Sequence, residues 1–118
     1  ALTKGTTALL VGVFGAAQQL GVLDELMAEW GRDGSKAGQE NERKVREVTA
    51  KAWRFTGEMD EIAATFAAAG MPSGFHEAAA ELYQRLAAFK DAPATPTLDA
   101  VLDALQSQTE SAVHAARR

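Results

Sequence analysis

The sequence predicts a single all-α domain, and two features of its composition indicate this class. Alanine, the best helix former, occurs 25 times among the 118 residues, whereas valine and isoleucine, which favour strands, together occur only 8 times. A chain of this length with 47% hydrophobic and 24% charged residues can bury one core but not two. We therefore expect residues 1–118 to form one domain of about five helices.

The first predicted helix runs from Leu2 to Leu20, and Gly21 is placed to end it. It is apolar on nearly every side, which is typical of a helix that is covered from several directions. Gly5, Gly12 and Gly15 each weaken an isolated helix by about 1 kcal/mol, so we expect neighbouring backbones to approach closely there. The cover that this helix needs also predicts a two-fold homodimer.

A short second helix and a loop are expected next. Apolar residues at helical spacing mark the helix, namely Leu23, Leu26, Met27 and Trp30. Residues 31–41 contain three glycines and no large apolar side chain, which predicts a solvated loop.

One long amphipathic helix follows, because apolar residues recur at alternating steps of three and four from Val45 to Ala69. Its end is predicted at Gly70 and Pro72. Trp53 lies beside this apolar stripe, and it belongs either to the core or to a contact with another domain or subunit.

Two more helices complete the predicted fold. Ser73 is placed to cap the fourth helix, whose buried stripe would be Phe75, Ala79, Leu82, Leu86 and Phe89. Residues 91–97 contain two prolines and predict a linker. Thr97 is placed to cap the fifth helix, which has apolar positions from Leu98 to Leu105, and the tail beyond Val113 is expected to fray.

Charge and composition exclude several classes of function. With 16 acidic and 12 basic residues the net charge is −4, so the chain lacks the positive field that binds nucleic acid. The unbroken apolar stretch from Ala8 to Ala17 is far shorter than the roughly 20 residues that span a bilayer, so no membrane contact is expected. The absence of cysteine excludes disulfides and thiolate metal sites and fits a cytoplasmic location.

Few residues carry a recognisable catalytic pattern. His76 is followed by Glu77, but Ala80 stands where the zinc motif H-E-x-x-H needs a second histidine, so no metal is expected. His76 is then either a polar residue near a helix start or a substrate-facing donor or acid–base group. The acidic cluster of Glu58, Asp60 and Glu61 indicates a solvated face, and no glycine-rich phosphate loop is present.

A series of short segments nevertheless resembles a known family, the helical C-terminal domain of 6-phosphogluconate-dehydrogenase-like proteins. These segments are residues 2–10 (LTKGTTALL), 50–55 (AKAWRF), 57–59 (GEM), 62–66 (IAATF), 70–72 (GMP) and 74–79 (GFHEAA). That domain is of unknown function and follows an NAD-binding domain. More broadly, the chain is similar to the β-hydroxyacid dehydrogenases.

The resemblance implies where the catalytic residues would lie. In that superfamily a catalytic lysine precedes the position that matches Ala1, so this chain contains no catalytic residue. A second lysine of the superfamily maps to Gly57, which cannot replace it, while Glu58 keeps the neighbouring acidic position.

Helical geometry identifies the residues that share the direction of the catalytic lysine. At about 100° per residue, Thr3 and Thr7 return within about 20° of that direction, whereas Lys4 lies about 80° from it. We expect Thr3, Lys4 and Thr7, together with His76, to contact substrate or its phosphate group.

The resemblance implies the C-terminal, substrate-cleft and dimerisation domain of an NAD(P)-dependent dehydrogenase that transfers hydride between nicotinamide and a hydroxy acid. NAD or NADP would be bound by an N-terminal Rossmann domain, and none by this chain alone. The alternative is a free-standing helical protein-interaction module without enzymatic activity, which would bind its partner through open faces around Phe14, Trp53 and Phe89.

Overall fold

The computed structural model describes residues 2–106, and all regular secondary structure in this range is helical, which confirms the all-α class. Residues 98–106 form a helical segment, and short 3-10 turns lie at Arg32–Gly34 and Ala87–Phe89. The predicted fraying beyond Val113 concerns residues outside the described range. The α-helices are α1 (Leu2–Gln19), α2 (Leu23–Trp30), α3 (Ala37–Val48), α4 (Ala52–Ala68) and α5 (Gly74–Arg85).

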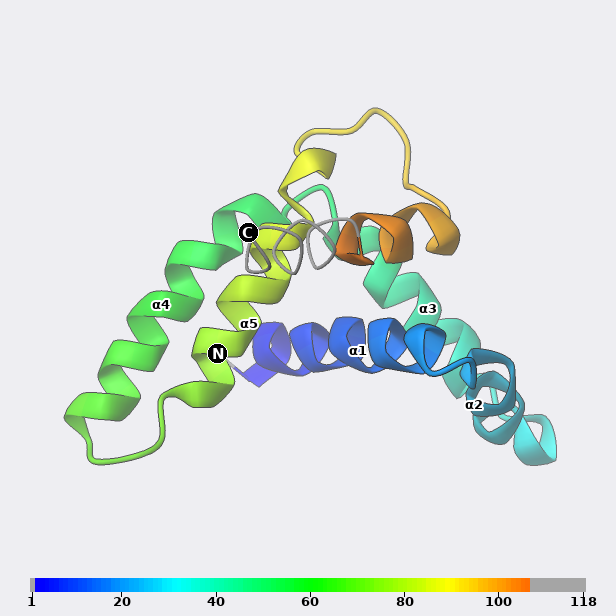
Figure 1. Cartoon of the computed structure of the whole chain (residues 1–118), viewed down its shortest axis with the longest axis horizontal. Helices are drawn as coiled ribbons and strands as arrows, with labels where there is room; N and C mark the ends of the chain where they lie inside the picture. The colour runs from blue at the N-terminus through cyan, green and yellow to red at the C-terminus, as the bar shows by residue number, and fades with distance from the viewer. Residues whose placement is uncertain (1, 107–118) are drawn as a thin grey trace, which may run out of the picture.

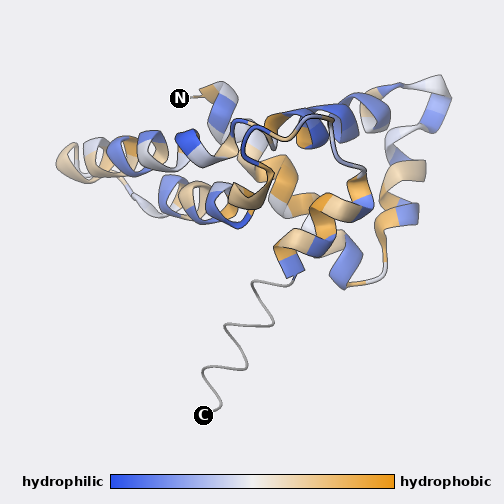
Figure 2. Cartoon of the chain, turned by 90° about the horizontal axis from the view of Figure 1, so that it is seen from above, coloured by the Kyte–Doolittle hydropathy of each residue, from blue (hydrophilic) through white to orange (hydrophobic). Residues whose placement is uncertain are grey.

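The helices form two groups that α1 connects. α4 and α5 lie side by side as a helical hairpin, and α1 passes α5 and continues to α2 and α3 (Figure 1). Hydrophobic residues gather toward the middle of the molecule, whereas α3 is largely hydrophilic (Figure 2). No helix in the described range is long and apolar enough to cross a bilayer.

The core lies where α1, α5 and the segment 98–106 meet, with contributions from α3 and α4. Its fully buried large side chains are Val11, Phe14, Val45, Met59, Tyr83, Leu86, Val101 and Leu102. The rings of Phe14 and Trp30 form a T-shaped pair with centroids 5.6 Å apart. The alternative prediction of an open face around Phe14 is therefore wrong, and Phe89 also packs against the core.

Two predicted helix ends are confirmed, and glycine explains both. Gly21 and Gly70 have positive φ angles of 74° and 76°, a conformation that glycine adopts without a steric penalty. At each end a backbone N–H reaches back five residues, from Val22 to Ala17 and from Met71 to Phe66. These bonds satisfy carbonyls that the helix itself leaves without partners.

The glycines inside α1 lie where other helices approach. A Cβ atom would stand 3.3 Å from Leu82 Cδ1 at Gly12 and 3.3 Å from Leu105 Cδ1 at Gly15. The expected close approach is present, but the neighbours are side chains and not backbones.

The prediction of one long helix from Val45 to Ala69 is wrong, because residues 49–51 separate α3 from α4. Thr49 is buried and its hydroxyl donates to the carbonyl of Arg46 at 2.7 Å. Around the break, Lys51 N–H bonds to Val48 and Ala52 N–H bonds to Thr49, which are tighter turns than those of an α-helix. The chain thus changes direction without losing local hydrogen bonds.

The prediction of a loop over residues 31–41 is correct only as far as Lys36. α3 begins at Ala37, whose backbone N–H donates to Ser35 Oγ at 3.2 Å. Gly38 is buried against the side chains of Met27 and Trp30, so the lack of a side chain lets α3 approach α2. The glycine that indicated a loop is therefore a packing position within a helix.

The fourth predicted helix differs in its cap and in its buried stripe. Ser73 stands at the N-cap position, but its hydroxyl donates to Glu77 Oε1 at 2.8 Å and does not cap a backbone N–H. Phe75 was expected in the buried stripe and is instead 78% exposed. Thr97, in contrast, caps the last segment as predicted, because its Oγ1 accepts from Ala100 N–H at 3.2 Å.

Gly57 and Gly70 allow a matched test of the two helix roles of glycine. A Cβ would meet nothing within 4 Å at either position, but only Gly70 has a positive φ. We expect Gly57→Ala, inside α4, to raise the free energy of unfolding by about 0.5–1 kcal/mol, and Gly70→Ala to lower it by a similar amount. Urea unfolding of both variants measures the difference, and equal shifts would contradict this explanation.

Candidate functional site

An open apolar groove of about 700 Å³ lies in the described part of the chain. It lies between the first turns of α1 and the start of α5, next to the end of α4. Leu2, Gly5 and Leu9 contribute from α1, and Phe66 closes it from α4. The groove thus forms where the hairpin of α4 and α5 meets the beginning of α1.

His76 lies in this groove and packs closely against its neighbours. Its ring is 4.7 Å from that of Phe66, centroid to centroid, and Nε2 would be 3.4 Å from a Cβ placed on Gly5. Its Nδ1 is shielded from solvent and has no hydrogen-bond partner in the described structure. The imidazole thus lies at van der Waals distance from the position of a side chain at residue 5.

Lys4 belongs to a different cluster, on the side of α1 that faces α4. Its Nζ lies 2.5 Å from Glu58 Oε2 and 4.5 Å from the centre of the Phe55 ring. The lysine side chain is 38% exposed. An ion pair at this exposure contributes little to stability, but together with the ring it restricts where the ammonium group lies.

Tyr83 holds the backbone of the same turn. Its hydroxyl donates to the carbonyl oxygen of Lys4, and its ring meets the edge of Phe55 at 5.5 Å between centroids. Burial raises the pKa of Tyr83 to about 12, and the charge of Glu58 acts in the same direction, while a backbone hydrogen bond at Ala8 lowers it. The phenol therefore stays protonated and serves as a hydrogen-bond donor.

The two threonines of the predicted site join neither cluster. Thr7 Oγ1 donates to the carbonyl of Thr3 at 3.0 Å, which is a bond within the helix, and Thr3 is exposed. The structure thus places the four predicted residues in three surroundings: His76 in the groove, Lys4 beside Glu58, and both threonines on α1 outside the groove lining. They do not form one constellation.

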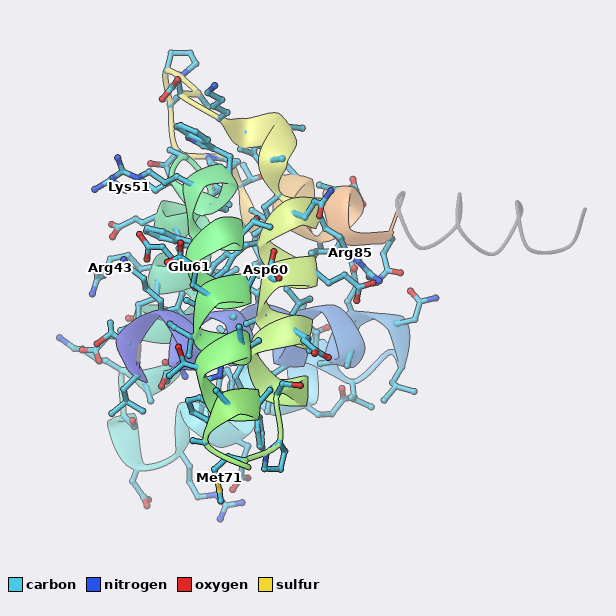
Figure 3. The ribbon with its side chains drawn as sticks, turned by 90° about the vertical axis from the view of Figure 1, so that its left-hand side faces the viewer. Arg43, Lys51, Asp60, Glu61, Met71 and Arg85 are labelled. Atoms are coloured by element: carbon cyan, nitrogen blue, oxygen red, sulfur yellow. The ribbon has the colours of Figure 1, made fainter. Side chains whose placement is uncertain are left out.

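The three acidic residues of α4 also lie in different surroundings. Asp60 and Glu61 lie on α4, at the side of the molecule that faces the viewer in Figure 3, and both are exposed, in agreement with a solvated face. Glu58, expected to belong to the same face, instead contacts Lys4. Among residues 2–106 no three His, Asp or Glu side chains gather closely enough to hold a metal ion.

The sequence analysis did not identify the exposed apolar residues that line the groove. Leu2 and Leu9 are 83% and 64% exposed, and Phe75 stands beside them. Leu2 and Leu9 are seven residues apart and so share one face of α1, and this spacing could have indicated an apolar surface patch. The uniform apolarity of this helix obscured that signal.

One comparison with known proteins gives a match. The model of a family described as "Domain of unknown function (DUF1932)" matches residues 17–86, which is more than half of the chain. The chain belongs to the DUF1932 family. No curated protein and no solved structure matches it.

The DUF1932 match covers the last turn of α1, all of α2 to α5 and the segments between them. It includes the resembling segments within residues 50–79, and therefore the α4–α5 hairpin with Glu58 and His76. It leaves out the first turns of α1, which carry Lys4 and the α1 side of the groove. The residues that match the DUF1932 family therefore include the α4 and α5 side of the candidate site but not the α1 side.

Proposed function

We propose that this chain is the C-terminal helical domain of an NAD(P)-dependent dehydrogenase of the hydroxyacid or 6-phosphogluconate type. In this proposal it borders the substrate cleft and forms the dimer, while an upstream Rossmann domain binds the dinucleotide. The resemblance of residues 50–79 supports this assignment. The position of Lys4 is the observation that supports a substrate cleft at the start of α1.

Lys4 offers a positioned cation at the start of α1. An ammonium group has three N–H donors, and Glu58 Oε2 accepts one of them. The remaining donors and the partial exposure of the side chain leave room for a carboxylate or phosphate oxygen. Tyr83 donates to the carbonyl oxygen of Lys4 and so positions the backbone from which this side chain extends.

The residues described here do not form a cradle for the dinucleotide itself. Such a cradle needs a strand, a glycine-rich turn and the N-terminus of a helix. Between residues 2 and 106 the glycines lie inside helices, at helix ends or in the turn after α2, and none follows a strand. The contribution proposed for this chain is therefore to bind and orient the anionic end of the substrate.

The proposed role of Lys4 predicts a selective kinetic effect. In the protein joined to its upstream domain, Lys4→Ala should raise KM for the hydroxy acid by about tenfold or more, because a charge-assisted hydrogen bond is lost. KM for NAD or NADP should not change. Lys44→Ala is the matched control, since Lys44 is an exposed lysine on α3 and its loss changes the net charge equally.

Two outcomes would contradict parts of this proposal. Micromolar binding of NAD or NADP to the 118 residues alone, measured by calorimetry, would overturn the domain assignment. Equal kinetics for Lys4→Ala and Lys44→Ala would remove the role of Lys4 and leave the domain assignment in place.

The open groove favours a second candidate function, a protein-interaction module without enzymatic activity. Its apolar lining has no catalytic pair of side chains, and exposed apolar patches of this kind mark contact surfaces. The coding sequence before Ala1 distinguishes the two functions. A strand-rich segment with G-x-G-x-x-G supports the dehydrogenase, whereas a start codon there supports the module.

A further inference from the structure

A second cation lies beside the Lys4–Glu58 pair, in the first turn of α4. Arg54 Cζ is 6.0 Å from the centre of the Phe55 ring, and Lys4 Nζ is 4.5 Å from the same centre. Arg54 and Glu58 are four positions apart on α4, so their side chains lie on one face of that helix. The side chains of Lys4, Arg54 and Glu58 therefore form one charged group beside this ring, which we call the Phe55 cluster.

The Phe55 cluster is open to a ligand. Arg54 is exposed, and the side chains of Lys4 and Glu58 are 38% and 46% exposed. Within residues 2–106 Arg54 forms no ion pair, whereas Glu58 is bonded to Lys4. A guanidinium group has five N–H donors in a planar fork that fits the two oxygens of a carboxylate. Donors for an anion thus remain on both cations.

We propose that the Phe55 cluster binds the carboxylate of the substrate, and that Glu58 makes it select a carboxylate over a phosphate group. Two positive charges and one negative charge give the cluster a single net positive charge. A carboxylate neutralises it, whereas a phosphate group carries a charge of about −1.5 to −2 near pH 7 and would leave excess negative charge beside Glu58. The inference rests on the proposed function and narrows it, because the end of the substrate that meets Lys4 is then its carboxylate.

The neighbouring charges of α4 leave this balance unchanged. Lys51 precedes the cluster by about one turn and Glu61 follows it by about one turn, and their opposite charges offset one another (Figure 3). Asp60 is two positions from Glu58 and therefore points to a different side of the helix. Among the described residues, Glu58 supplies the carboxylate that contacts Lys4.

Titration of the 118-residue chain with two small hydroxylated anions tests the selection. Lactate offers a carboxylate and glycerol 3-phosphate offers a phosphate group, and NMR shifts at constant ionic strength measure the affinity for each. We expect lactate to bind about fivefold more tightly to the wild type. Glu58→Gln should shift the ratio of affinities toward glycerol 3-phosphate by about fivefold or more, because it removes one negative charge at contact distance.

Glu61→Gln is the matched control, since it changes the net charge equally at an exposed position of the same helix. It should change the ratio of affinities little. Lys4→Ala and Arg54→Gln should each weaken lactate binding by about tenfold, because a charge-assisted hydrogen bond is lost. Circular dichroism verifies that each variant remains helical.

Each result supports or overturns one part of the proposal. Tighter binding of glycerol 3-phosphate by the wild type, or equal ratios for Glu58→Gln and Glu61→Gln, would overturn the selection by Glu58. Absent lactate binding, or binding that neither Lys4→Ala nor Arg54→Gln weakens, would overturn the subsite itself. If lactate binds as expected but the protein joined to its upstream domain oxidises no hydroxy acid, the dehydrogenase proposal fails and the carboxylate subsite stands.

Discussion

Replacing Phe14 with alanine should lower the free energy of unfolding by about 3–5 kcal/mol, the largest change expected for a single substitution in this chain. Phe14 is fully buried in α1 and forms a T-shaped ring contact with Trp30, the last residue of α2. Its removal leaves a cavity that the close-packed surroundings fill only in part.

Phe75→Ala is the matched control for Phe14→Ala, because the same atoms are removed from a ring that is exposed within one copy. Its effect at low protein concentration should stay within about 0.5 kcal/mol. Urea unfolding at several concentrations separates this intrinsic effect from any loss of association. Equal destabilisation by both substitutions would mean that the packing around Phe14 is described incorrectly.

Raising the pH above 10 should destabilise the fold through Tyr83. The pKa of Tyr83 is about 12 in the folded chain against an ordinary value of 10.0. Between these values the unfolded chain releases the phenol proton and the folded chain retains it, so the free energy of unfolding falls as pH rises. Below pH 10 the phenol is protonated in both states, and this contribution to stability is fully present.

Tyr83 is the single tyrosine of the chain, so absorbance of the tyrosinate reports this residue alone. Its midpoint should lie near pH 12 in the folded chain and move toward 10 in urea. Tyr83→Phe should make stability less dependent on pH in this range than it is in the wild type, which isolates the contribution of Tyr83. A folded-state midpoint near 10 would contradict the described burial of the hydroxyl.

Helix ends and helix type could be predicted from the sequence where a local signal decides them. Gly21, Gly70 and Thr97 each act within a few residues, and the structure places helix boundaries at all three. The break between α3 and α4 gave no such signal. Residues 49–51 contain neither glycine nor proline, and Val48, Ala52 and Phe55 keep helical spacing across it, so periodicity continues although the helix does not.

The candidate site depended on contacts between distant segments, which periodicity does not reveal. Lys4 and Glu58 are 54 positions apart and meet in the folded chain, where Tyr83 of α5 bonds to the backbone of Lys4 and packs against Phe55 of α4. Phe75 follows the apolar spacing of α5 but lines an open groove and is 78% exposed, so its spacing predicted burial that the packing does not provide. His76, one position later, lies in the groove between the ring of Phe66 and the backbone of Gly5.

The close contacts at the glycines of α1 also predict that substitutions in separate helices depend on one another. At Gly12 and Gly15 the helix meets Leu82 and Leu105 with bare backbone, so those two side chains determine how far α1 stands from its neighbours. A larger residue at Gly12 is compatible with this geometry only when residue 82 becomes smaller or shifts. Substitutions at these paired positions are therefore expected to become fixed together in a lineage, although residues 12 and 82 are far apart along the chain.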